Sequence, residues 1–188
     1  MAHIIKFKES PLCLIDLIHE QVIYATTYEG LINEIEKVIQ EFKKEVTGER
    51  FIDGKKLTAE ALGRVGQEFK PGQTEQCCYF VRDCLKSAGI TAGITAKASD
   101  GMQTSEGYAS SLAGDDIGFK ISEIKDLFPG DLVFFKNTYG TWPEGTITHI
   151  GIYIGSGYFV HRPTASRPVE KAYLESYGHF REGRRIYV

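Results

Sequence analysis

The chain has 188 residues, of which 42% are hydrophobic, 25% charged and 12% aromatic, values typical of one globular catalytic domain or of such a domain with a small extension. Its 22 basic and 25 acidic residues give a net charge of −3, which argues against a dedicated nucleic-acid-binding protein because no overall basic field exists. No apolar run approaches the roughly 18 residues of a membrane span, so we expect a soluble protein. The four cysteines are too few for a disulfide scaffold at this length.

The N-terminal region predicts a small α/β extension without recognisable chemistry. Residues 3–7 and 21–26 have the composition of short strands. From Leu31 to Val46 apolar residues recur at helical spacing with Glu and Lys between them, which predicts an amphipathic packing helix that ends at Gly48. The first residues lack the basic segment, apolar core and cleavage site of a secretory signal, so we expect synthesis in the cytoplasm.

A hairpin-like run at residues 50–56, with Asp53 and Gly54 as its turn, separates this extension from the rest of the chain. We therefore expect two parts: residues 1–55 as an extension of unknown role and residues 56–188 as the catalytic domain.

The next segment alternates helical and loop patterns. Thr58 is expected to cap a short helix that runs to about Val65, and residues 69–75 have loop composition. Apolar residues from Cys77 to Ala88 mark one face of a helix. Residues 91–118 are rich in Thr, Ser, Ala, Gly and Asp, with a short helix around 105–112, and a polar stretch of this length predicts a binding loop.

Four β-type runs follow, at residues 132–135, 147–154, 158–160 and 185–188. In the second run the period of two places Ile150 and the isoleucines in phase with it on one face. The opposite face carries His149, Gly151 and Tyr153, and the glycine leaves room for another group beside the imidazole.

His161 can reach the same face as His149, depending on the turn between their strands. If Gly155–Gly157 forms a three-residue turn, His161 comes opposite Gly151, and diagonal neighbours of this kind lie roughly 7–8 Å apart at the backbone. A two-residue turn would place His161 on the other face. The sequence allows both arrangements.

A thiol near these histidines would complete the requirements for nucleophilic catalysis. Cys77 lies where a polar loop meets a helix start, and the helix N-terminus is expected to lower the pKa of its thiol. Cys77, His149 and His161 would then serve as nucleophile, base and orienting group. Cys78 is the competing nucleophile, but it points about 100° away around the helix, and the Cys77 face is the one expected to meet the sheet.

A zinc site built from one of these cysteines and the two histidines is the other reading of the cluster. The sequence contains no C-x-x-C pair and no H-E-x-x-H motif, so we expect neither a metal nor another cofactor.

The order of these motifs resembles the NlpC-type cell-wall cysteine peptidases. The resemblance rests on a cysteine at a helix start, Pro-Gly-Asp-Leu-Val-Phe-Phe at 129–135, His-Ile-Gly-Ile-Tyr-Ile-Gly at 149–155 and Val-His at 160–161. It covers about residues 58–188 and implies a papain-like α+β fold, with the catalytic cysteine at the N-terminus of a helix packed on an antiparallel sheet. It also implies that Cys77 is the nucleophile, that His149 is the base and that His161 is the third catalytic residue.

The resemblance implies peptidoglycan stem peptides as substrate, cut at the γ-D-glutamyl link to the diamino acid. Without a recognised secretory signal, the sequence is compatible with cytoplasmic recycling, with a phage lysis or tail protein, and with an effector delivered to the cell wall by a non-classical route. Gln76 stands where the family usually has Asp, and Phe69 begins the segment that replaces a substrate-holding element, so we expect both to bind substrate. Asp115 and Asp116 of the polar loop are expected to attract the free amine of a stem peptide.

Two alternatives remain at this point. Gln-Cys followed by an aromatic residue is also similar to the related CHAP amidases, so an amidase or acyl hydrolase acting on another substrate is one. The other is a phage tail or delivery component with weak or no hydrolysis.

Overall fold

The chain folds into two units, Met1–Arg50 and Phe51–Val188, each with its own sheet. The computed structural model describes residues 3–5, 12–16, 21–25, 32–33, 54–68, 76–163 and 167–186. None of the helices in these described ranges is both long enough and apolar enough to cross a membrane.

The first unit contains a three-stranded antiparallel sheet in the order β1-β2-β3, built from β1 (His3–Ile5), β2 (Leu12–Asp16) and β3 (Gln21–Ala25). The predicted strands at 3–7 and 21–26 are confirmed over the described residues, whereas β2 was not predicted. The expected helix up to Val46 and its end at Gly48 lie outside the described residues, apart from two helical residues at 32–33.

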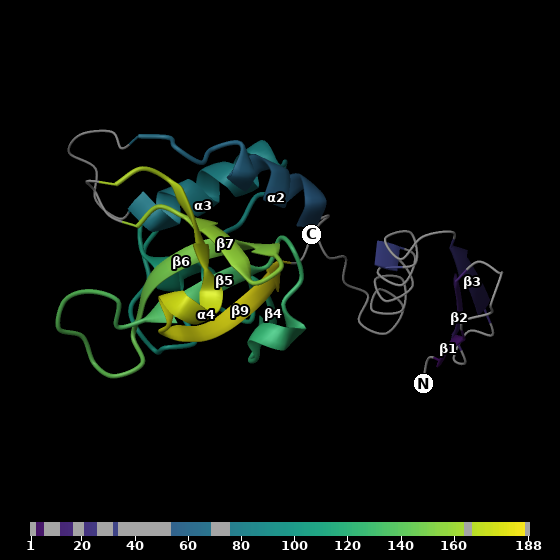
Figure 1. Cartoon of the computed structure of the whole chain (residues 1–188). Helices are drawn as coiled ribbons and strands as arrows, with labels where there is room; N and C mark the ends of the chain where they lie inside the picture. The colour runs from purple at the N-terminus through teal and green to yellow at the C-terminus, as the bar shows by residue number, and fades with distance from the viewer. Residues whose placement is uncertain are drawn as a thin grey trace. The chain divides into compact units, whose positions relative to one another are not determined.

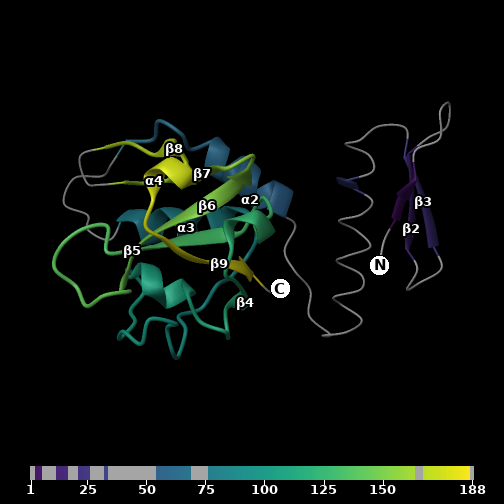
Figure 2. The same ribbon diagram turned by 60° about the horizontal axis from the view of Figure 1, so that its bottom comes forward.

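The second unit is built on a six-stranded antiparallel sheet in the order β4-β9-β5-β6-β7-β8 (Figures 1 and 2). Its strands are β4 (Gly118–Ile121), β5 (Leu132–Lys136), β6 (Ile147–Gly155), β7 (Tyr158–His161), β8 (Glu170–Tyr173) and β9 (Phe180–Ile186). Its helices are α2 (Gly54–Leu62), α3 (Gln76–Ser87), the single turn α4 (Leu174–Tyr177) and two short 3-10 turns, η1 (Ala109–Leu112) and η2 (Ile124–Asp126).

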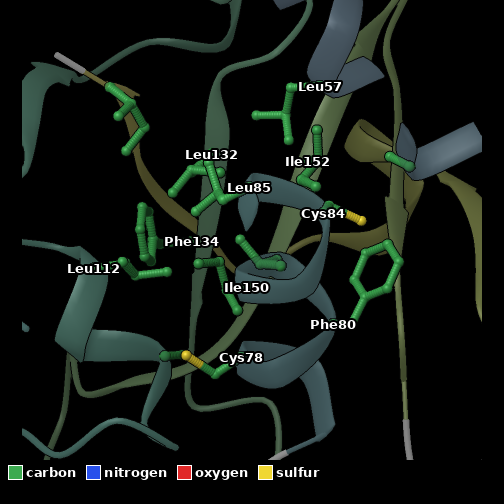
Figure 3. Packing of buried hydrophobic residues seen from close by; sticks show 14 of the residues in the cluster. Leu57, Cys78, Phe80, Cys84, Leu85, Leu112, Leu132, Phe134, Ile150 and Ile152 are labelled. Atoms are coloured by element: carbon green, nitrogen blue, oxygen red, sulfur yellow. The ribbon is translucent and has the colours of Figure 1, made fainter. Parts of the chain in front are cut away.

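The alternation of side chains along the strands creates a separate core on each face of this sheet. Ile150 and Ile152 of β6 pack against α2 and α3 in the larger core, together with Phe134 of β5 (Figure 3). Tyr153 of β6 lies in the smaller core on the other face, which Leu174 of α4 also joins. The predicted isoleucine face is therefore confirmed, because period two fixes which residues share a face of a strand.

The predicted hairpin at residues 50–56 is wrong over its described part, because α2 begins at Gly54. A Cβ atom at Gly54 would lie 1.9 Å from the carbonyl oxygen of Pro129, so this glycine permits a close approach between two backbones instead of forming a turn. Thr58 accordingly lies inside α2 and does not cap it.

The helix predicted from Cys77 to Ala88 is confirmed by α3, and the strands predicted at 132–135, 147–154 and 158–160 are confirmed by β5, β6 and β7. The short helix predicted around 105–112 contracts to η1. Strands β4 and β8 were not predicted, and β9 begins five residues before the run expected at Arg185.

Candidate active site

Two histidines from adjacent strands form the centre of the site. Nε2 of His149, on β6, lies 2.7 Å from Nδ1 of His161, on β7, and the rings meet edge to face with centroids 4.9 Å apart. Both side chains are buried, with 3% and 0% of their surface exposed. This hydrogen bond leaves Nδ1 of His149 as the ring nitrogen that can exchange a proton with a third group.

The turn between β6 and β7 decides that the two histidines share a face. Only Ser156 and Gly157 connect the paired residues Gly155 and Tyr158, but a register shift between Tyr153 and Gly155 compensates for the short turn. Beyond the shift Ile152 pairs with Val160, which is the register expected for a three-residue turn. The turn residues 155–157 all have positive φ (94°, 52° and 80°), and two of these are glycines, which adopt such angles without strain.

Gly151 gives His161 the space that the sequence predicted. A Cβ atom at Gly151 would lie 3.2 Å from Cβ of His161, 2.9 Å from the carbonyl oxygen of Val160 and 2.7 Å from Cδ2 of Phe159. Any larger side chain at this position would push β7 away from β6. The glycine therefore permits the short contact between the two imidazoles.

Cys77 approaches this pair from the N-terminal turn of α3. The backbone N–H of Ile150 lies within hydrogen-bonding reach of its thiol, and Ile150 directly follows His149 in β6. The thiol also acts on Tyr177, whose ring stacks on His149, so α3 places it near β6 from a position about 70 residues earlier in the chain. The first backbone N–H groups of α3, which have no acceptor within the helix, also point toward this end.

Burial sets the charge state of the resting site. Burial raises the pKa of Cys77 to about 12, with the neighbouring Cys78 acting in the same direction and the N–H groups of Ile150, Cys78 and Cys77 opposing it. Burial lowers the pKa of His149 to about 4. The N–H groups at the helix N-terminus lower the pKa of the Cys77 thiol, as expected, but desolvation outweighs them, so the expected net lowering is wrong. The resting pair is a neutral thiol and a neutral imidazole.

Cys78 points away from the histidines. Its Sγ is buried 3.3 Å from the carbonyl oxygen of Glu106 and 3.2 Å from that of Tyr108, and it lies 3.8 Å from Oγ of Ser111. Figure 3 shows Cys78 within the packed cluster of the larger core. This position supports Cys77, the partly exposed neighbour, as the nucleophile.

The polar stretch at residues 91–118 is held as a loop against α3 by Arg82. Its guanidinium donates to the carbonyl oxygens of Glu106 (2.9 Å), Ala92 (3.0 Å) and Gly93 (3.2 Å) and to Oγ of Ser111 (2.8 Å). The loop conformation predicted from composition is confirmed and lies next to the helix that carries Cys77, whereas its role in binding stays a prediction.

The four residues expected to bind substrate are placed unequally. Asp115 pairs with Arg184 at 2.6 Å, and Asp116 accepts hydrogen bonds from Thr95 and from the backbone N–H of Ala96, at 3.0 Å for the latter. These partners hold the pKa of both carboxyl groups below its usual value. Gln76 is the first residue of α3, and Phe69 lies outside the described residues. Attraction of an amine by the two aspartates stays a prediction.

Tyr177 is part of the site and was missed by sequence reasoning. Its ring stacks on His149 with centroids 5.9 Å apart and an interplanar angle of 28°, and it meets His161 edge to face at 5.1 Å. Burial raises the pKa of Tyr177 to about 12, and the nearby thiol of Cys77 acts in the same direction. No motif pointed to this residue, because it lies in a single helical turn 16 residues beyond His161.

Within the part of the chain that the structure describes, no group of three or more His, Cys, Asp or Glu side chains is arranged to hold a metal ion. The groups that the described site presents are a free thiol at Cys77 and a pair of hydrogen-bonded imidazoles.

The chain is similar to a set of known proteins. The sequence model of the NlpC/P60 family matches residues 66–181. A γ-D-glutamyl-L-lysine dipeptidyl-peptidase of Bacillus cereus (strain ATCC 10987 / NRS 248) is 32% identical over 114 residues, which are 60% of this chain and 28% of the relative. The bifunctional muramidase/DL-endopeptidase CwlT of Bacillus subtilis (strain 168) is 36% identical over 104 residues, 52% of this chain and 26% of the relative.

The chain thus spans about a quarter of the length of these two curated relatives. Among solved structures, the NlpC/p60 domain of the peptidoglycan hydrolase SagA matches with a TM-score of 0.51 and 21% identity, over 72% of this chain and 100% of that domain. This likeness confirms the predicted papain-like α+β fold.

Proposed function

Since the chain belongs to the NlpC/P60 family, we propose that it is a cysteine peptidase that hydrolyses amide bonds in the stem peptides of peptidoglycan. The observation that carries the proposal is the 2.7 Å contact between His149 and His161, with the thiol of Cys77 at the backbone of Ile150, the next residue of β6. A nucleophile, a base and a group that orients the base are the three parts that acyl transfer requires.

In the proposed mechanism, Nδ1 of His149 takes the thiol proton as Sγ of Cys77 attacks the scissile carbonyl carbon. The imidazolium that forms donates its Nε2–H to Nδ1 of His161, which stabilises its charge. The N–H groups at the start of α3 hydrogen-bond to the oxyanion of the tetrahedral intermediate. His149 then gives its proton to the leaving amine, and water, deprotonated by the same imidazole, hydrolyses the thioester.

The neutral resting pair suits this sequence of steps. A base whose pKa is lowered to about 4 is unprotonated at neutral pH and ready to accept the thiol proton.

We extend the proposal to the bond between γ-D-glutamate and the diamino acid. The names of the two curated relatives, a γ-D-glutamyl-L-lysine dipeptidyl-peptidase and a DL-endopeptidase, support this choice. Gln76 and Phe69, which lie at or before the start of α3, and Asp115 and Asp116 of the loop are the residues we propose to contact the stem peptide.

The proposal is tested by incubating the protein with purified sacculi and identifying the released fragments by mass spectrometry. We expect fragments that end at γ-D-glutamate, and none with the Cys77→Ala variant. Cys78→Ser is the matched control, because a hydroxyl at position 78 can still donate to the carbonyls of the loop. Release of no fragment by the folded wild-type chain would reject a peptidoglycan substrate. Equal release by Cys77→Ala would reject the nucleophile.

A further inference from the structure

His161 has a buried ring nitrogen whose role is unassigned. Its Nδ1 contacts His149, but its Nε2 is buried and makes no hydrogen bond with any residue in the described ranges. The side chain is fully buried, so water from bulk solvent cannot hydrogen-bond to this nitrogen. A buried N–H without an acceptor costs about 1–3 kcal/mol, so the position of the nearest acceptor matters.

That acceptor is the carboxylate of Glu170, whose Oε1 lies 3.5 Å from Nε2 of His161. Glu170 on β8 is the direct register partner of His161 on β7, so the backbone ladder keeps the two side chains opposite each other. The other carboxylate oxygen, Oε2, forms an ion pair with Arg167. Arg167 thereby leaves Oε1 as the oxygen that faces the imidazole, and a shift of a few tenths of an ångström would make the contact a hydrogen bond.

The tautomer of His161 determines whether His149 can act as a base. If His161 carries its proton on Nε2, its Nδ1 accepts a hydrogen bond from Nε2–H of His149, and Nδ1 of His149 is free to take the thiol proton. If His161 instead carries its proton on Nδ1, it donates to Nε2 of His149. The proton of His149 must then lie on Nδ1, and the ring cannot deprotonate Cys77.

We propose that Glu170 is a positioning residue whose carboxylate accepts the Nε2–H of His161 and so holds both histidines in the tautomers that make His149 a base. The inference rests on the proposed Cys77 and His149 chemistry and extends the site to a row of four side chains on three strands and one helix: Cys77, His149, His161 and Glu170. A carboxylate is a pure acceptor, so it favours one tautomer of the ring it faces.

Other groups around His161 do not replace this acceptor. His149 faces it from β6, Tyr177 contributes its ring from α4, and Arg167, from the segment before β8, is a cation that can only donate. Burial, His149 and Arg167 lower the pKa of His161 to about 3. The ring is therefore neutral at pH 7 and can carry its single proton on either Nδ1 or Nε2. Among the groups named, Glu170 alone offers a charged acceptor to Nε2.

The Glu170→Gln variant tests the tautomer directly. The glutamine has a single carbonyl oxygen, which Arg167 binds, so its NH2 group faces His161 and can only donate. This should move the proton of His161 to Nδ1 without changing the size of the side chain. ¹⁵N shifts and two-bond couplings of the two imidazoles at pH 7 should show Nε2–H for His161 in the wild type and predominantly Nδ1–H in the variant.

The kinetic readout follows from the same change. A serine peptidase whose imidazole is held in the wrong tautomer loses about 10⁴ in kcat, and we expect Glu170→Gln to lower kcat by about a hundredfold with KM unchanged. The matched control is Glu175→Gln, an exposed glutamate in α4 whose loss should change neither tautomer nor kcat. Thermal melts of all variants check folding.

An Nδ1–H tautomer of His161 in the wild type would overturn the proposal without any variant, so a variant that fails to fold leaves the test standing. A folded Glu170→Gln variant that keeps the wild-type kcat would also overturn the proposal. Because the NMR readout needs no substrate, it separates this inference from the proposed function. A chain that shows the expected tautomers but releases nothing from sacculi would refute only the substrate.

Discussion

Replacing Gly151 by alanine should damage the site through a single methyl group. The added Cβ would lie 2.9 Å from the carbonyl oxygen of Val160, whereas ordinary contacts begin at 3.4 Å, so the two strands must separate by 3.4 − 2.9 = 0.5 Å at this point. If the strands separate by the same 0.5 Å at the two rings, the contact between His149 and His161 lengthens from 2.7 Å to 2.7 + 0.5 = 3.2 Å. Overpacking of this kind costs about 2 kcal/mol of unfolding free energy.

The effect on catalysis should exceed the effect on folding. Misplacement of a catalytic group by about 1 Å can cost a hundredfold in rate, so half that displacement should lower kcat by about tenfold. The assay compares kcat on soluble stem peptides with urea unfolding for both the wild type and Gly151→Ala. Gly93→Ala is the control, because its Cβ would meet nothing within 4 Å. If Gly151→Ala retains wild-type kcat and stability, the close packing of β6 on β7 does not set the geometry of the two histidines.

Three further outcomes are expected. Cys78→Ala should lose about 1–2 kcal/mol of unfolding free energy in urea titrations, because the carbonyls of the loop lose their thiol donor, while Cys78→Ser should lose less; the reverse order would contradict the assigned contacts. Burial lowers the pKa of His149 to about 4 and that of His161 to about 3, so below pH 6.5 the unfolded chain binds more protons than the folded chain. The unfolding free energy should therefore fall as the pH falls from 6.5 toward 4. A flat profile would show that the rings are not buried as neutral groups. Tyr177→Phe should keep kcat within about twofold, since the ring that stacks on His149 remains. Tyr177→Ala should lower kcat and should also lower the unfolding free energy by about 2 kcal/mol in the same titrations. A fully active Tyr177→Ala variant would refute a role for the ring.

Local patterns were sufficient to predict the elements that carry the proposed site. The helix that begins near Cys77 and the strand with His149 both have a clear period, and the period also indicates which face of each element is buried. The glycine at position 151 could be interpreted correctly because a missing side chain in a buried strand has a direct steric meaning. The prediction of a hairpin around Gly54 was wrong because the contact that requires this glycine is a long-range one, with Pro129.

The sequence by itself therefore determined the order of helix and strands, the face of β6 that carries His149, and the residue types needed for thiol chemistry, because these depend on neighbours a few positions apart. Only the tertiary structure decided the rest. The register shift before Gly155 brought His161 onto the face of His149, and strand pairing and α4 brought Glu170 and Tyr177 to the histidines. Burial reversed the expected direction of the pKa of Cys77. Register, long-range packing and desolvation depend on which distant segments come together, and no local period of the sequence encodes that.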